Sequence, residues 1–302
     1  MFSWLFIIIL AYFFFSIASL GDKLVLNRAQ NPKLYVFYVG VLGLFVLFLI
    51  PFVGFSILDR ISFLWVFLAS LFLISSLYFL YSAVEKFDVS RVVPIFGSVQ
   101  PAFILFLSWF FFRAGVIGFN NILAFTFLLL GSIMISFEKK PEFTKNLLSL
   151  SLFASFLMAL SFIFLKVVFL SQPFFQSIIW MGIFNFLIVL FFLFDAKFRK
   201  EVFINNKPAF DKKTMYLVLG TQSAGGLGGI LQNFAIFLAP VSGLAIINAM
   251  KGIQYVFLFV ITLLFSKFLP KILKEEISFT VILQKIISIC LIVVGLAILI
   301  SF

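Results

Sequence analysis

The sequence predicts an all-α integral membrane protein whose ten transmembrane helices form two inverted five-helix repeats. Three observations support this prediction: the composition, the length of the apolar runs and an internal repeat. Hydrophobic residues make up 64% of the 302 residues and charged residues 11%, whereas ordinary soluble chains carry about 25% charged residues. The chain therefore has too little polar surface to coat a body exposed to water.

Apolar runs of about 20 residues, the length that a helix needs to cross a bilayer, recur along the whole chain. Because the runs are continuous rather than alternating, they favour helices over the strands of a barrel. The predicted spans lie near residues 3–27, 34–53, 62–84, 89–112, 117–137, 147–170, 173–194, 214–238, 241–266 and 278–301. The longest hydrophilic stretch, from Asp195 to Thr214, is only a loop and leaves no room for a soluble catalytic domain.

Residues 1–142 and residues 143–302 form the two halves of the predicted repeat. The recurring pairs are Lys23 and Lys166, Pro32 and Pro173, Gly40 and Gly182, Ala83 and Ala235, and Gly131 and Gly295. Five spans per half is an odd number, so the second half must insert upside down relative to the first. Because the first span has a counterpart, we expect it to be a span and not a removable signal peptide.

Missing residue types exclude several kinds of chemistry. The chain has no histidine, which removes imidazole metal sites and Ser-His nucleophile pairs. Its one cysteine, Cys290, lies in an apolar run where we expect it to be buried, and it allows no internal disulfide or thiolate cluster. We therefore expect no enzyme activity, no cofactor and no metal site.

The ends of the two halves resemble a known family. The runs PAFILFLSWFFF, NNILAFTFLLLGSIMI and EEISFTVILQKIISICLIVVGLAIL are similar to the repeat ends of the EamA-type drug/metabolite transporter superfamily. The residues that match its pattern are Pro101, Gly131, Glu275, Gln284 and Gly295, whereas Arg113 stands where an acidic residue is expected. The resemblance implies a ten-span transporter of small metabolites, built from two inverted repeats.

Lys251 is the most informative candidate for a substrate-binding residue. It lies about ten residues into the ninth predicted span, where a lysine costs roughly 2.5 to 3.5 kcal/mol to insert. Asn248 and Tyr255 share its face at helical spacing, and Gln254 lies beside them. The resemblance implies a role, because in the phosphate and nucleotide-sugar branches of the superfamily a lysine in the ninth span contacts the anionic part of the substrate. The alternative is a lysine that snorkels or bonds to a carbonyl and binds no ligand.

No carboxylate accompanies Lys251 at mid-span, because Asp22 and Glu85 both lie near helix ends. An anionic substrate is therefore the simplest partner for the ammonium group. The lack of a buried acid also removes the usual proton carrier, which favours exchange or facilitated diffusion over proton antiport.

The fourth predicted span should contribute to the same cavity. Its sequence RVVPIFGSVQPAF favours a broken helix with free carbonyls, or else a Pro kink that serves only packing. It places Gln100 opposite Lys251 and Ser98 nearby. Further candidates are Gln222 on the eighth span and Tyr78 and Tyr81 on the third. Weaker candidates are Tyr12, Ser16, Trp180, Asn185, Gln232 and Asn233.

Two other patterns favour packing or anchoring over ligand binding. In the eighth span, Gly225 and Gly229, and likewise Ala224 and Gly228, have the spacing that permits close helix approach. The repeat-related Lys23 and Lys166 are expected to snorkel toward opposite membrane faces.

The charge distribution predicts the orientation. Most of the 22 Lys and Arg residues lie on the face that carries the first, third and later odd-numbered connections, whereas Arg60 and Arg113 lie on the other. The positive-inside rule makes the basic face cytoplasmic and puts both termini outside, whereas the resemblance implies cytoplasmic termini. A net charge of +11 suits contact with anionic lipid and implies no nucleic-acid partner.

These observations favour a secondary transporter, acting as an exchanger, facilitator or exporter, for a small and anionic metabolite. Its expected partners are the substrate and the lipid bilayer, and its expected location is a prokaryotic plasma membrane. The alternatives are a membrane scaffold or biogenesis protein and a flippase for a lipid-linked substrate. A scaffold would not need Lys251 at mid-bilayer, and an enzyme would need an acid/base pair that the sequence does not show.

Overall fold

A computed structural model describes residues 3–26, 32–87, 89–113, 118–136, 144–203, 212–266 and 279–301, and all regular secondary structure within them is helical. The helices are α1 (Ser3–Leu26), α2 (Pro32–Leu42), η1 (Gly43–Leu49), α3 (Ile50–Val53), α4 (Arg60–Lys86), α5 (Val89–Phe112), α6 (Phe119–Ser136), α7 (Lys145–Phe169), α8 (Phe174–Leu190), η2 (Phe191–Phe194), α9 (Ala196–Phe203), α10 (Lys212–Leu238), α11 (Gly243–Ala249), α12 (Gly252–Ser266) and α13 (Phe279–Ser301).

Several of these helical stretches are long and apolar enough to cross a membrane. Within the described residues seven meet this condition: Ser3–Gly21, Pro32–Val53, Arg60–Lys86, Ile95–Phe112, Lys145–Phe169, Phe174–Phe194 and Gly243–Ile261. Phe119–Ile135 and Leu283–Ile298 are apolar but shorter. α10 is in neither group, and its sequence GTQSAGGLGG is rich in glycine and polar residues. The chain is an all-α membrane protein.

Side chains cap the first turn of two long helices. Asp59 precedes α4 and accepts hydrogen bonds from the backbone N–H groups of Ile61 and Ser62, each 3.1 Å long. The hydrogen bonds from Ser62 lower the pKa of the Asp59 carboxyl. Thr144 caps α7 in the same way, accepting from the N–H of Leu147. These caps satisfy backbone donors that the helices themselves leave free.

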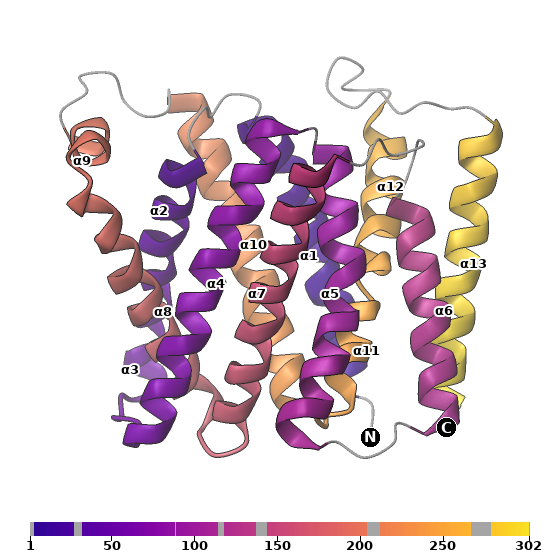
Figure 1. Ribbon diagram of the computed structural model, residues 1–302, viewed down its shortest axis with the longest axis horizontal. Coiled ribbons are helices and arrows are strands. Elements are labelled where there is room, and N and C mark those ends of the chain that lie inside the picture. The colour runs from indigo at the N-terminus through magenta and orange to yellow at the C-terminus, as the bar shows by residue number, and fades with distance from the viewer. Residues whose placement is uncertain are drawn as a thin grey trace.

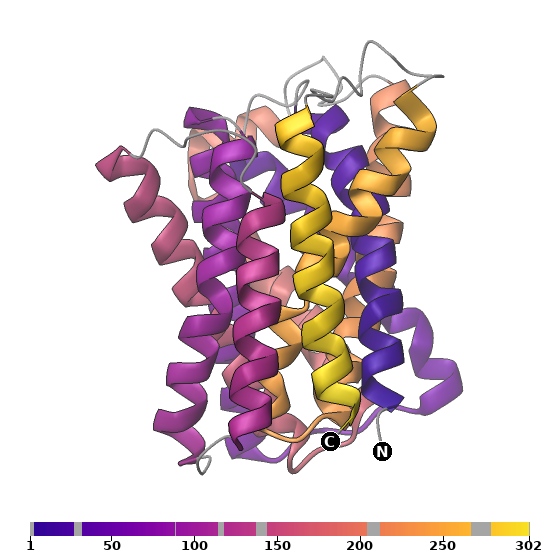
Figure 2. The same ribbon diagram turned by 90° about the vertical axis from the view of Figure 1, so that its right-hand side faces the viewer.

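The helices stand side by side as one bundle, and α1 begins on the same side of it as α13 ends (Figure 1). α1 packs against α10 and α12, α4 against α7 and α8, and α5 against α7 and α11. At one edge α13 lies along α6, which Figure 2 shows from the side. Segments from the two halves of the sequence are therefore neighbours throughout the bundle.

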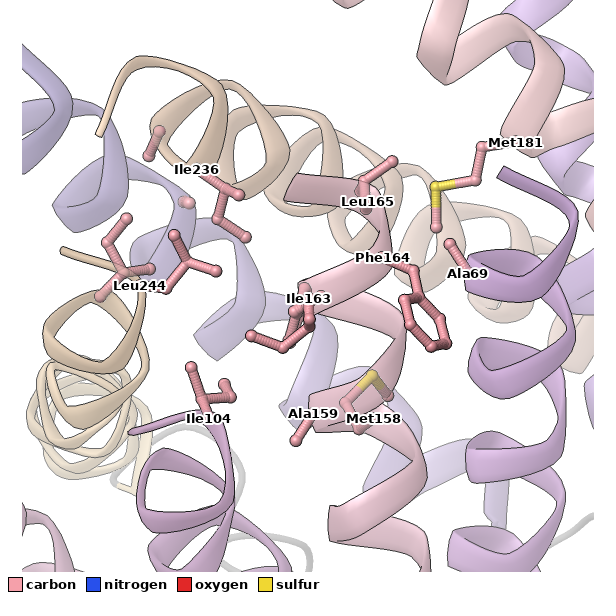
Figure 3. Close-up of a cluster of buried hydrophobic side chains, with 14 of the residues drawn as sticks. Ala69, Ile104, Met158, Ala159, Ile163, Phe164, Leu165, Met181, Ile236 and Leu244 are labelled. Atoms are coloured by element: carbon pink, nitrogen blue, oxygen red, sulfur yellow. The ribbon is translucent and has the colours of Figure 1, made fainter. Parts of the chain in front are cut away.

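α7 lies at the centre of the hydrophobic core. Figure 3 shows its residues from Met158 to Leu165 surrounded by side chains of other helices. The labelled neighbours are Ala69 of α4, Ile104 of α5, Met181 of α8, Ile236 of α10 and Leu244 of α11, and all are buried. Many large apolar residues, such as Phe52 and Trp109, are exposed. This distribution is the one expected where lipid, and not water, is the outer solvent.

Glycines allow close contact where helices of the two halves cross. A Cβ atom on Gly131 would lie 2.9 Å from the carbonyl oxygen of Ser288 and 2.7 Å from the Ile292 side chain. A Cβ on Gly295 would lie 3.1 Å from the carbonyl oxygen of Ala124 and 2.8 Å from Leu128. Each glycine thus faces the residues three and seven positions before the other glycine. α6 and α13 can approach this closely only because both positions lack a side chain.

Two expectations about packing need correction. On α10, Gly225 and Gly228 face α1, but a Cβ on Gly229 would meet nothing within 4 Å, so the contact does not follow the predicted four-residue spacing. Residues that share one face of a helix are three or four positions apart. On α10 these are Thr221, which contacts Gly21 of α1, then Gly225 and Gly228. Cys290 is exposed on α13 and not buried, because its apolar run has one face outside the bundle.

Candidate functional site

The helix of the ninth predicted segment is broken at Lys251. α11 ends at Ala249 and α12 begins at Gly252, with Met250 and Lys251 in a turn between them. The hydroxyl of Ser132, from α6, occupies the break: it donates to the carbonyl of Ala249 at 2.7 Å and accepts from the N–H of Gly252 at 2.9 Å. A side chain inserted into the backbone ladder is a known cause of a helix break.

Lys251 projects from this break toward α5. Its ammonium nitrogen lies 4.8 Å from the centre of the Phe96 ring, and its Cδ and Cε atoms pack over Gly97. The residue is half-buried. Among the described residues, the ammonium group makes no hydrogen bond and no ion pair. A cation–π contact offsets only part of the cost of removing an ammonium group from water.

Three predicted site residues share this interface with α5. The Tyr255 hydroxyl packs over Gly97 next to Lys251. Gln100 donates from Nε2 to Oδ1 of Asn248 at 3.2 Å, and Asn248 donates to the carbonyl of Leu244 at 3.0 Å. The structure therefore brings Lys251, Asn248, Tyr255 and Gln100 together, although Gln100 bonds to Asn248 and does not itself face the ammonium group.

The break is in the ninth segment and not in the fourth, where the prolines predicted it. α5 is helical from Val89 to Phe112, through Pro94 and Pro101. Ser155 of α7 donates to the carbonyl of Phe96 at 2.7 Å, so a neighbouring helix supplies a donor to this part of α5. Proline is tolerated within membrane helices, and α5 continues through both of its prolines. Ser98 is buried and its hydroxyl bonds within α5, to the carbonyl of Ile95.

The remaining predicted residues lie apart from Lys251. Gln254 faces α1, where it donates to Ser19 at 2.8 Å. Gln222 donates to the Tyr35 hydroxyl at 2.6 Å, and the Tyr35 ring meets the Tyr81 ring edge-on at 4.8 Å. This second cluster joins the first turn of α2 to α4 and α10. Tyr78 is exposed and contacts Phe79 and Phe192, so it belongs to neither group.

Lys166 does not snorkel, as the sequence led us to expect. It is 2% exposed, and its ammonium nitrogen lies 2.9, 3.3 and 2.6 Å from the carbonyl oxygens of Ile236, Phe237 and Ala239. These carbonyls end α10 and have no partner within their own helix. Lys166 is therefore a helix cap supplied by another helix. The side chain of Lys23, its counterpart in the first half, lies outside the described residues.

Sequence reasoning missed two contributors to the site and its support, and it gave a third only as a weaker candidate. Phe96 and Ser132 gave no signal because each lies in an apolar run, and their roles depend on which helix faces them. Tyr12, a weaker candidate, donates to the carbonyl of Ile247 at 2.6 Å and is contacted by Gln232. The adjacency of Lys251 and Gly252 was the available signal for the break, since glycine weakens a helix.

Comparisons with known proteins identify a similar fold. No family model and no curated protein matches the sequence. A crystal structure of a protein superposes with a TM-score of 0.71 at 14% sequence identity, over 98% of this chain and 96% of that chain. At this identity the likeness concerns the fold alone.

Proposed function

We propose that this protein is a secondary transporter of a small anionic metabolite and that Lys251 is the electrostatic anchor for the substrate. The observation that carries the proposal is the state of the Lys251 ammonium group. It lies at a helix break inside the bundle, on the face of Phe96, with no anionic or carbonyl partner among the described residues. An anionic ligand would supply the missing charge.

The broken helix supports the same proposal. The N-terminus of a helix carries a partial positive charge, and α12 begins directly after Lys251. Discontinuous helices whose N-termini point at an anionic group of the substrate are typical of secondary transporters. Lys251 lies at the start of such a helix, directly before Gly252.

The helix neighbours support an architecture of ten spans in two inverted repeats. If α1, α4 and α5 correspond to α7, α10 and the α11–α12 pair, then the contact of α1 with α10 has its counterpart in that of α7 with α4. The contact of α12 with α1 likewise matches that of α5 with α7. The reciprocal packing of Gly131 and Gly295 is what a two-fold axis between α6 and α13 would produce.

A second glycine pair supports the same two-fold relation. A Cβ on Gly40 would lie 3.1 Å from the carbonyl oxygen of Asn185, and one on Gly182 would lie 2.7 Å from that of Gly43. Each glycine again faces the residue three positions from its partner. Movement of the two repeats about a site between them would give alternating access.

The resemblance of the repeat ends to the EamA-type drug/metabolite transporters favours this function and a prokaryotic plasma membrane location. We also propose exchange or facilitated diffusion over proton antiport. The buried polar residues of the described part include no Asp or Glu that could carry a proton.

Ligand-induced stabilisation of the purified protein tests the proposal. The wild type, Lys251→Met and Lys251→Arg should be heated with a panel of carboxylates, phosphorylated metabolites and neutral amino acids. We expect at least one anion to raise the Tm of the wild type, with no rise for Lys251→Met and a smaller rise for Lys251→Arg, whose planar head needs a different geometry.

Transport of the stabilising anion into proteoliposomes completes the test. Thr126→Ala is a matched control, because the Thr126 hydroxyl is exposed and bonds only within α6. This variant should transport like the wild type, whereas Lys251→Met should not transport. Undiminished transport by Lys251→Met would refute the role of Lys251.

A further inference from the structure

We infer that the ligand at Lys251 is a monocarboxylate whose remaining part is uncharged and largely apolar. This inference rests on the proposed function and names the substrate class of the same site. Its basis is the number of charges around Lys251, the pairing of the neighbouring amides and the chemistry of the surrounding side chains.

The described interior of the bundle offers one cation for a ligand. The other buried lysines are already engaged: Lys166 donates to three carbonyls, and the ammonium group of Lys285 lies 4.3 Å from the Phe259 ring and has further interactions. Lys251 can therefore compensate one negative charge. A ligand with two charges would leave one of them uncompensated inside the bundle, at a large cost.

A phosphate ester fits this site poorly. It carries a charge of about −1.5 to −2 at pH 7 and three strong acceptor oxygens. Proteins usually meet such a group with several donors, often with the fork of an arginine. In the described part of the site, the amide of Gln100 is bonded to Asn248, and that of Asn248 to the carbonyl of Leu244. Each of these amides therefore has one of its two N–H donors engaged within the protein, which leaves fewer donors than a phosphate group usually meets.

A zwitterionic amino acid also lacks a partner for one of its charges. Its ammonium group would need a carboxylate, and the buried polar residues among those described include no Asp or Glu. The ammonium of the ligand would also lie within the field of Lys251, which repels it. A carboxylate without a second charge avoids both costs.

The side chains around Lys251 suit an apolar remainder. The ring of Phe96 lies under the ammonium group, and the backbone of Gly97 lies under the stem of Lys251. Tyr255 lies beside them. The hydroxyl of Tyr12 donates a hydrogen bond to the carbonyl of Ile247, so this polar group is already paired. The aromatic rings beside Lys251 favour an apolar or aromatic body in the ligand.

A matched series of ligands on one carbon skeleton tests the inference. Hydrocinnamate is the monocarboxylate, hydrocinnamide its neutral analogue, phenylalanine the zwitterion and phenethyl phosphate the phosphate ester. Octanoate adds an aliphatic monocarboxylate. Affinities for the wild type and Lys251→Met should be measured by calorimetry in the same detergent. We expect one or both monocarboxylates to bind at least tenfold more tightly than the other three, and to lose this advantage in Lys251→Met.

The pH dependence of phosphate-ester binding adds a second readout. The second pKa of a phosphate ester is about 6, so the monoanion dominates at about pH 5.5 and falls to about one hundredth at about pH 8. If the site accepts only one charge, binding of phenethyl phosphate should weaken by roughly 50- to 100-fold over this range. Hydrocinnamate stays ionised throughout and serves as the control for changes in the protein.

The outcomes separate this inference from the proposed function. Tight, Lys251-dependent binding of phenethyl phosphate at about pH 8, or of phenylalanine, would overturn the monocarboxylate class and leave the anion anchor intact. Failure of both monocarboxylates to bind the wild type would also overturn the class. Binding of any of these anions that is equal in wild type and Lys251→Met would instead overturn the role of Lys251 itself.

Discussion

Two lysines of the described residues, Lys166 and Lys251, differ in whether their ammonium groups have hydrogen-bond acceptors. Lys166 is buried and donates to three carbonyl oxygens at the end of α10, whereas the Lys251 ammonium lies on an aromatic ring without an acceptor among the described residues. The sequence places both in apolar runs. The importance of Lys251 could be predicted from its depth in the span, because depth is a local property. The cap made by Lys166 could not, because its partners lie 70 to 73 positions away.

Removing each charge should therefore affect stability in opposite ways. Lys166→Met leaves the carbonyls at the end of α10 without a donor, and we expect a loss of about 3 kcal/mol. Lys251→Met relieves a desolvation cost, so its Tm without ligand should equal or exceed that of the wild type. Thermal unfolding of both variants in the same detergent measures the difference. An equal loss in the two variants would mean that Lys251 also has a structural partner.

The broken helix is the feature at the scale of secondary structure that matters most for the site. The prolines of α5 predicted a break in the fourth span, but α5 is continuous and the break lies between α11 and α12. Seven of the predicted spans match stretches of the described residues that are long and apolar enough to cross a membrane, and these could be predicted from the length of the apolar runs. The break depends on a hydroxyl from α6 and on the absence of a side chain at Gly252, and no local signal joins these two residues.

Substitution at the break should be costly. A Cβ on Gly252 would lie 2.5 Å from Oγ of Ser132 and 3.1 Å from its Cα, so we expect Gly252→Ala to lose about 1–3 kcal/mol. Gly226→Ala is the matched control, because a Cβ there would meet nothing within 4 Å. The control should be neutral or gain up to about 1 kcal/mol from helix propensity. Thermal unfolding of the two variants is the measurement, and equal stabilities would contradict the packing described at the break.

At the scale of the whole molecule, α1 begins and α13 ends on the same side of the bundle (Figure 1). α1 ends and α2 begins on the opposite side of the bundle (Figure 1). On that side Lys33 of α2 forms an ion pair with Asp195 at 2.8 Å, and this hydrogen bond lowers the pKa of the Asp195 carboxyl. The distribution of charge between the two faces stays a prediction, whereas contacts such as this one could not be predicted from the sequence.

The charge distribution predicts that the basic side faces the cytoplasm. Two single cysteines, each in a background without the exposed Cys290, test this with an impermeant thiol reagent on intact cells. Asn206→Cys, in the loop between α9 and α10 and outside the described residues, should resist labelling. Ile57→Cys, at a position 80% exposed between α3 and α4, should label readily. The reverse pattern would place both termini in the cytoplasm, as the family resemblance implies.

The most direct test of the anion anchor is a crystal structure with a brominated hydrocinnamate, located by the anomalous signal of bromine. We predict a signal between α5 and the break that separates α11 from α12. The carboxylate should lie at a charge-assisted hydrogen-bond distance of about 2.7–2.9 Å from Nζ of Lys251. A ligand bound elsewhere, with the Lys251 ammonium still on the ring of Phe96, would contradict the assignment of Lys251 as the anchor.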